Sequence, residues 1–236
     1  MYQIELIIGS DTKLAEPVLE HPDILDALTY LNIRLGFEEQ TIREVADRYR
    51  INLEALLVII LTYCGQLLPE KTIKKEALSD LLGFLKNAHN DFKQNQIPEL
   101  KNRIALFASE IPEKHGNVLI SFFDGYIGEL SDHFKYEDET VFPYIEAILN
   151  GRPTSGFAMH EFEKNHTDIE QKLYDLKNIL IKYIPEASDS GCRKQILRNL
   201  FYFEQQLSYH TELENRVLAP SVKKVEKKGR RTKDSK

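Results

Sequence analysis

The sequence is poor in cysteine. Among 236 residues only Cys64 and Cys192 are cysteines, and they stand far apart in the chain. Their positions match no spacing that predicts a metal site or a redox pair, and two cysteines make no disulfide framework. This scarcity fits a reducing compartment, so we expect the protein to be cytoplasmic.

The sequence also lacks an excess of positive charge and a long apolar run. Its formal net charge is -6, which gives no general attraction to nucleic acid or to an anionic membrane. The first residues, MYQIELIIGSDTK, have neither a basic region nor a long apolar region, so no signal peptide is expected. The most apolar run begins at Leu53 but contains Glu54. It is too short for a membrane span, and we expect a buried helix.

Strand signals are scarce as well. The composition, 42% hydrophobic and 29% charged, is ordinary for a soluble globular protein with a core of normal size. Apolar residues recur at spacings of three and four along most of the chain, and this pattern is typical of amphipathic helices. The sequence therefore predicts an all-α protein.

Residues 1–72 are predicted to form a small helical N-terminal domain. Its helices begin near Pro22, at Thr41 and at Leu53. Thr41 is followed three residues later by Glu44, which predicts a capping box. The last two helices resemble a helix-turn-helix, but the helix from Leu53 has no basic side chains with which to read DNA. We therefore expect a docking or interaction module.

Residues 73–222 are predicted to form an antiparallel four-helix bundle. Long amphipathic helices joined by short connections pack most simply in this way. The first helix is expected to be loosened near Pro98. The four helices span roughly residues 73–106, 113–149, 157–182 and 192–222.

Residues 223–236 form a basic tail. It contains eight Lys and Arg residues against Glu226 and Asp234. We expect a frayed, solvated and disordered end. A contact with an acidic partner is the alternative.

A repeat runs through the predicted bundle. Residues 130–143 read LSDHFKYEDETVFP, and residues 207–220 read LSYHTELENRVLAP. His133 and Glu137 recur as His210 and Glu214, a shift of 210 − 133 = 77 residues. Residues four apart lie on the same face of a helix, so each histidine and its glutamate point the same way.

The same shift finds two more histidines. His89 is matched by His166, since 166 − 89 = 77, and Asp91 is matched by Asp168. The chain thus contains two copies of a helix with His followed by a helix with His-x-x-x-Glu. No local motif would have selected His89 or His166.

Two such helix pairs would bring four histidines and two glutamates together inside the bundle. Burying these groups without a metal would be costly, and coordination removes that cost. Imidazole and carboxylate ligands suit iron, manganese or zinc. Because two carboxylates can bridge two metals, a dinuclear site is the simplest interpretation. The six candidate metal ligands are His89, His133, Glu137, His166, His210 and Glu214.

Other residues near this pattern have competing interpretations. His160 lies six residues before His166, about 240° round a helix, and its repeat position is Gly83, so His166 is preferred as a ligand. Glu129, one turn before His133, is either a carboxylate that supports the site or an ordinary exposed glutamate. Tyr126 and Phe203 are expected to be core residues.

The motifs HNDF, H-x-x-x-E-x-x-x-x-x-P, NHTD and again H-x-x-x-E-x-x-x-x-x-P, in this order, resemble the hemerythrin-like (HHE) domain proteins. The likeness is strongest to the iron–sulfur cluster repair di-iron proteins, often called RIC, and covers residues 78–222. It implies a non-haem centre of two iron ions with an oxo-type bridge. The four histidines would be terminal ligands, and Glu137 and Glu214 would bridge. Members of that subfamily act in nitrosative and oxidative stress and help to restore damaged clusters.

One part of that family's pattern is missing. The repair proteins usually carry a Cys-Cys-Gly-Gly motif in their N-terminal domain. At the corresponding place, just before Gln40, residues 35–38 read LGFE, and neither cysteine replaces the pair by position. The resemblance therefore supports a di-iron site better than a repair activity that needs thiols.

The leading hypothesis is a cytoplasmic di-iron protein that reacts with NO, O2 or peroxide, or gives up iron to a damaged cluster. One alternative is a hemerythrin-like protein that binds or senses O2 or NO without turnover. Another is a stress regulator in which the metal is structural and the N-terminal domain does the work. The implied partners are a small molecule and a damaged iron–sulfur protein, or another protein bound through the N-terminal domain. A second copy of the chain, as a homodimer, stays open.

Overall fold

The computed structural model describes residues 7–66, 70–152, 159, 167–188 and 191–233. These residues form helices and one isolated β-bridge, between Lys13 and Thr41, and contain no strand. The prediction of an all-α protein is confirmed. Within the same ranges, no helix is both long and apolar enough to cross a membrane.

The chain divides into two compact units. One unit draws on residues 1–88, 144–159 and 209–236, and the other on residues 89–143 and 160–208. The division falls within three helices, α5 (Lys75–Asp91), α8 (Phe142–Leu149) and α10 (Gly191–Leu213).

The N-terminal residues form four short helices in the first unit. They are α1 (Ala15–Glu20), α2 (Ile24–Tyr30), α3 (Ile42–Tyr49) and α4 (Leu53–Tyr63). The predicted capping box at α3 is confirmed: the Thr41 hydroxyl accepts from the Glu44 N–H, and the Glu44 carboxylate accepts from the Thr41 N–H. Helix α4 is largely buried, as its apolar sequence predicts.

These short helices pack against later parts of the same unit. The ring of Tyr63 stacks on Tyr209 with centroids 4.3 Å apart, and the Tyr209 hydroxyl donates to Asp23 at 3.0 Å. The Asn52 N–H donates to Asp80 of α5 at 2.6 Å. The described residues before α5 therefore share their core with α5 and with the segment that begins at Tyr209.

The remaining helices of the first unit are α5, α8 (Phe142–Leu149), the π-helix η6 (Glu214–Leu218) and α11 (Ala219–Lys233). Lys86 of α5 forms an ion pair with Glu146 of α8. The sequence predicts a frayed end after Val222, whereas helix α11 continues to Lys233. Lys, Arg and Glu favour helices, and Glu226 accepts a hydrogen bond from the Tyr144 hydroxyl at 2.5 Å.

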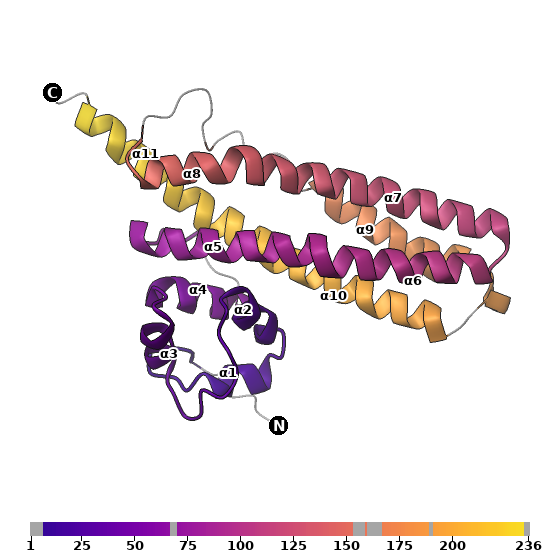
Figure 1. The fold of residues 1–236 in the computed structure, drawn as a ribbon, viewed down its shortest axis with the longest axis horizontal. Coiled ribbons are helices and arrows are strands. Elements are labelled where there is room, and N and C mark those ends of the chain that lie inside the picture. Colours follow the sequence, from indigo (N-terminus) through magenta and orange to yellow (C-terminus); the bar gives the residue numbers. More distant parts are fainter. Residues whose placement is uncertain (1–6, 67–69, 153–158, 160–166, 189–190, 234–236) are drawn as a thin grey trace. The chain divides into compact units, whose positions relative to one another are not determined.

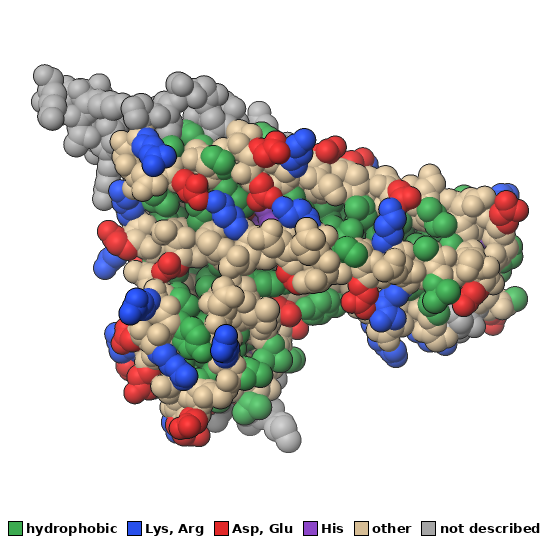
Figure 2. Space-filling view, viewed as in Figure 1, with side chains coloured by type: hydrophobic (Ala, Val, Ile, Leu, Met, Phe, Trp, Pro, Cys, Tyr) green, Lys and Arg blue, Asp and Glu red, His purple; other side chains and the backbone are tan. Residues whose placement is uncertain are grey.

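Four helical segments run beside one another in the second unit (Figure 1). They are η1 with α6 (Phe92–Gln96, Ile97–Glu110), α7 with η2 (Glu113–Tyr136, Glu137–Val141), α9 with η4 (Thr167–Asn178, Ile179–Tyr183), and the first part of α10. Leu119, Phe123, Leu176 and Leu200 of these segments are almost completely buried. Acidic and basic side chains mix on the exposed face in Figure 2, as amphipathic helices require.

The helix bounds agree closely with the predicted ones where the structure describes them. Residues 113–149 form one helical stretch, as predicted. The first long stretch runs from Lys75 to Glu110 and is not broken at Pro98. The third predicted helix, 157–182, is seen from Thr167, because most of its earlier residues lie outside the described ranges.

Four five-residue π-helical segments, η1, η2, η4 and η6, occur among the described residues. In each, the first N–H after the segment donates to the carbonyl five residues earlier. A proline stands six residues after the first residue of every one. Proline has no N–H, and its ring collides with the carbonyl four residues earlier in an α-helix, so a widened turn before it relieves both problems. These prolines are Pro98, Pro143, Pro185 and Pro220.

Candidate metal centre

The two His-x-x-x-Glu motifs have the same local backbone. Helix α7 ends just before Glu137, which is the first residue of η2, and α10 ends just before Glu214, the first residue of η6. Each glutamate thus lies where an α-helical turn becomes a π-helical one, and both glutamates are fully buried. π-helical turns inside α-helices are frequent at functional sites.

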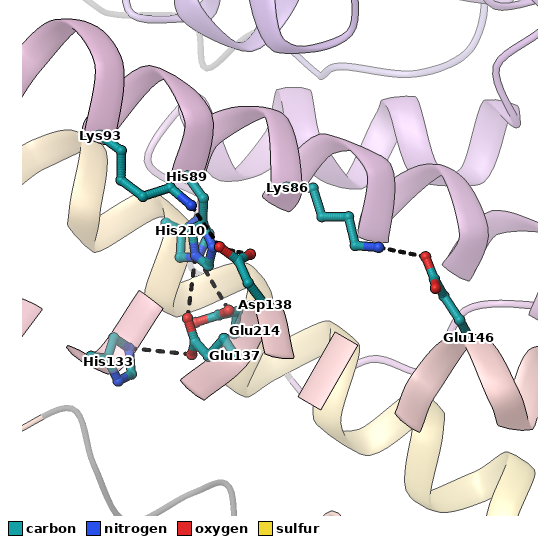
Figure 3. Close-up of polar contacts among 9 residues, drawn as sticks. All are labelled: Lys86, His89, Lys93, His133, Glu137, Asp138, Glu146, His210 and Glu214. Atoms are coloured by element: carbon teal, nitrogen blue, oxygen red, sulfur yellow. Dashed lines mark hydrogen bonds and ion pairs between the residues drawn. The ribbon is translucent and has the colours of Figure 1, made fainter. Parts of the chain in front are cut away.

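In the second unit, two histidines face one carboxylate. His89 Nε2 lies 3.2 Å from Glu137 Oε2, and His133 Nε2 lies 3.2 Å from Glu137 Oε1. The side chains of His89 and Glu137 are fully buried, and that of His133 is 9% exposed. Two imidazole nitrogens therefore approach the two oxygens of one buried carboxylate (Figure 3).

In the first unit, the second motif repeats this pairing. His210 Nε2 lies 3.1 Å from Glu214 Oε1, with both side chains almost completely buried. Burying a carboxylate requires partners that offset the loss of water, and imidazole or a metal ion can provide them.

Four of the predicted ligands are buried. His89, Glu137, His210 and Glu214 each offer a nitrogen or oxygen atom that could hold a metal ion. Imidazole nitrogens and carboxylate oxygens suit iron, manganese or zinc. The donor set therefore fits the kind of metal that the sequence predicts.

His89 is held from its other side by a carboxylate. Its Nδ1 donates to Asp138 Oδ1 at 2.9 Å, and Lys93 Nζ donates to Asp138 Oδ2 at 2.6 Å. Partial burial raises the pKa of Asp138, but the hydrogen bonds and charges of His89 and Lys93 outweigh it and bring the pKa below its usual value. Asp138 is therefore a carboxylate at neutral pH, and it turns Nε2 of His89 toward Glu137.

Neither Asp138 nor Lys93 was singled out from the sequence. Lys93 lies four residues after His89, on the same helical face, and Asp138 directly follows Glu137. These offsets could indicate residues that support the site, but charged residues are common at such offsets. Only the packing of the helices shows that Asp138 reaches His89 and that Lys93 reaches Asp138.

Aromatic rings surround His89. The ring of Phe134 lies 4.3 Å from the imidazole and that of Phe142 lies 5.2 Å from it, centroid to centroid. Phe92 stacks on Phe134 and meets Phe203 edge to face. All four rings are buried. They keep water away from the His89 side, which strengthens charge interactions there.

The other predicted residues have separate outcomes. His166 and His160 lie outside the described residues. Glu129 is about half exposed and forms an ion pair with Lys172, which favours the interpretation of an ordinary surface residue. Tyr126 and Phe203 are core residues, as predicted. Burial, and to a lesser extent the charge of Glu204, raises the pKa of Tyr126.

Residues 80–222 match the family model described as the hemerythrin HHE cation-binding domain. The chain belongs to this family. The match covers more than half of the chain and includes both His-x-x-x-Glu motifs. The predicted resemblance is therefore confirmed, and the HHE domain is a metal-binding module.

Curated relatives of this HHE protein carry a repair name. It is 23% identical over 188 residues to the iron-sulfur cluster repair protein YtfE of Musicola paradisiaca (strain Ech703). The same protein of Salmonella schwarzengrund (strain CVM19633) is also 23% identical over 188 residues. Each match covers 77% of this chain and 82% of the relative.

Proposed function

We propose that this HHE protein is a non-haem di-iron protein that acts in nitrosative and oxidative stress and helps to restore damaged iron–sulfur clusters. The observation that carries the proposal is the group of buried ligand atoms of His89, Glu137, His210 and Glu214. The named relatives support the repair role.

In this proposal two iron ions are held by four histidines and two glutamates. Bound iron supplies a redox-active centre that can take up O2, NO or peroxide. The protein residues supply a dry, preformed set of donors, because the glutamates and His89 are already buried and oriented. The proposed ligands are His89, His133, Glu137, His166, His210 and Glu214.

Metal analysis of protein purified without oxygen tests the metal. We expect about two irons per chain, the number that two bridging carboxylates can hold, and an optical spectrum that changes on adding O2 or NO. Zinc alone, or no metal in protein made with ample iron, would contradict the di-iron centre.

A pair of histidine variants tests the ligand choice. His166→Ala is expected to lose metal, whereas His160→Ala is expected to keep it. The opposite result would show that the repeat selects the wrong histidine. Glu129→Gln serves as a control, because Glu129 is an exposed residue paired with Lys172.

The alternative function is binding or sensing of O2 or NO without turnover. The N-terminal domain lacks the cysteine motif, and burial, followed by the charge of Glu20, raises the pKa of Cys64 to about 11. Cys64 is thus a poor thiolate donor at neutral pH. Neither feature favours iron transfer through a thiol.

An iron-transfer assay separates the two functions. The protein carrying labelled iron is incubated with a protein whose iron–sulfur cluster has lost one iron. Repair predicts that label moves into the cluster and that cluster activity returns. Binding without turnover predicts a spectral change with O2 or NO and no movement of label.

A further inference from the structure

We propose that Asp138, held by Lys93, is a positioning residue that locks the ring of His89 and makes the His89 side of the metal centre the slower one to release its metal. The inference rests on the proposed di-iron function and concerns how tightly each of the two metals is held.

The geometry around His89 defines this role. Asp138 Oδ1 can only accept, so a proton on His89 Nδ1 makes this 2.9 Å contact and Nε2 is the nitrogen left to bind a metal. Nε2 is the nitrogen that lies 3.2 Å from Glu137. The contact therefore selects the tautomer that a metal ligand needs and fixes the direction of its lone pair.

Lys93 completes the arrangement. Its Nζ donates to the other oxygen of Asp138 at 2.6 Å, which holds the carboxylate in place. His89 is fully buried, whereas the side chains of Asp138 and Lys93 are 28% and 33% exposed. The order from surface to interior is thus lysine, aspartate, histidine, and each contact restricts the next side chain (Figure 3).

Only the first copy of the sequence repeat contains this aspartate and this lysine. The residue that follows the glutamate is Asp138 in the first copy and Asn215 in the second, at 138 + 77 = 215. Lys93 likewise corresponds to Glu170, at 93 + 77 = 170. In sequence, the second copy therefore has a neutral amide in place of the Asp138 carboxylate and a carboxylate in place of the Lys93 ammonium. A carboxylate behind an imidazole increases its donor strength and orients it, and loss of such a partner weakens metal binding about 10- to 100-fold. We infer that the two metals leave at different rates.

Chelator challenge of the iron-loaded protein measures those rates. In the wild-type protein we expect two phases of iron loss, one fast and one slow. Asp138→Asn keeps the shape of the side chain and removes its charge, so the slow phase is expected to become about tenfold faster or more. Lys93→Met should speed the same phase less. Asp124→Asn is the matched control, because Asp124 pairs with Lys101 at 3.2 Å in the same unit and precedes His133 by nine residues in α7.

The tautomer of His89 gives a readout that needs no metal. In metal-free protein labelled with ¹⁵N-histidine, the His89 signals are assigned by their loss in His89→Gln. We expect the pattern of protonated Nδ1 in the wild type and in Asp124→Asn, and a shift toward a mixture of tautomers in Asp138→Asn. A merely structural role for Asp138 would leave this pattern unchanged.

The outcomes separate this inference from the proposed function. If the wild-type protein binds no iron, the proposed function fails, while the NMR pattern still tests the lock on His89. If two irons bind but Asp138→Asn releases them at wild-type rates with an unchanged tautomer, the positioning role is wrong. A single phase of release in the wild type would overturn the difference between the two sides.

Discussion

Gly116 of α7 packs directly against the backbone of Ala108 in α6. A Cβ built on Gly116 would lie 2.5 Å from the Ala108 carbonyl oxygen, closer than two such atoms can approach. Only glycine allows the two helices to meet this closely at the turn that joins them.

We therefore expect Gly116→Ala to lower the free energy of unfolding by about 1–3 kcal/mol, the usual cost of overpacking. Urea unfolding followed by circular dichroism measures the change. Gly125→Ala and Gly128→Ala are matched controls in the same helix, because no atom lies within 4 Å of their added Cβ. They should be neutral or stabilising by up to about 1 kcal/mol, since alanine favours helices. Equal destabilisation by all three variants would contradict the close contact.

Cys64 should react slowly with alkylating reagents at neutral pH. Burial raises its pKa to about 11, so the reactive thiolate is scarce near pH 7. In Cys192→Ser protein, the rate of iodoacetamide modification is expected to rise steadily from pH 7 to pH 10. Cys64→Ser shows the reaction of the other thiol for comparison. A rate that levels off below pH 9 would show an ordinary, accessible thiol.

The capping box at α3 should contribute a pH-dependent part of the stability. Hydrogen bonds from the Thr41 N–H and hydroxyl lower the pKa of Glu44 below its ordinary value of 4.5. A lowered carboxyl pKa stabilises the folded state above pH 4.5, and this contribution is lost as the pH falls through the folded-state pKa. Glu44→Gln should therefore destabilise the protein at pH 7 and have little effect in strong acid.

A double-mutant cycle checks the cause of that pH dependence. Thr41→Ala removes the hydroxyl and should cost about 1 kcal/mol, as is typical of an N-cap. In the Thr41→Ala background, the effect of Glu44→Gln at pH 7 should be smaller than in the wild type. Thermal unfolding at several pH values gives all four free energies, and strictly additive effects would argue against the reciprocal cap.

Removing metal should destabilise the protein beyond the site itself. Glu137 and Glu214 are fully buried, and a bound cation offsets the cost of burying their charges. A metal that binds only the folded state, present at 100 times its dissociation constant, adds about 2.7 kcal/mol. Treatment with a chelator should lower the unfolding midpoint, and restoring iron should return it. In Glu137→Ala/Glu214→Ala protein the chelator should have no such effect. An unchanged wild-type midpoint would mean that the metal does not stabilise the fold.

Helix periodicity and helix caps can be read from the sequence because they depend on neighbouring residues. The bounds 113–149 and the capping box of Thr41 and Glu44 were predicted in this way and are confirmed. The π-helical segments were not predicted. A proline follows each segment at the same offset, but from the sequence alone a proline predicts no more than the loosened helix expected near Pro98.

The sequence by itself determined the class of the fold and the set of residues that are candidates for the metal. The shift of 77 residues connects His89 to His166 and Glu137 to Glu214 without any structural information, because a duplicated sequence pattern keeps its offsets. As ligands, these residues remain proposals. Asp138 illustrates what lay beyond the sequence. Asp138 reaches His89, which lies 49 residues earlier. In the sequence alone, Asp138, like its neighbour Glu137, is one of many acidic residues.

Only the tertiary structure decided which side chains meet. It paired Glu129 with Lys172 at the surface, placed Lys93 and His89 on the two oxygens of Asp138, and enclosed the imidazole between Phe134 and Phe142. The physical reason is that helical periodicity specifies the face on which a residue lies, whereas packing specifies what that face touches. Contacts between residues far apart in the chain depend on the packing of whole helices, and no local pattern encodes them.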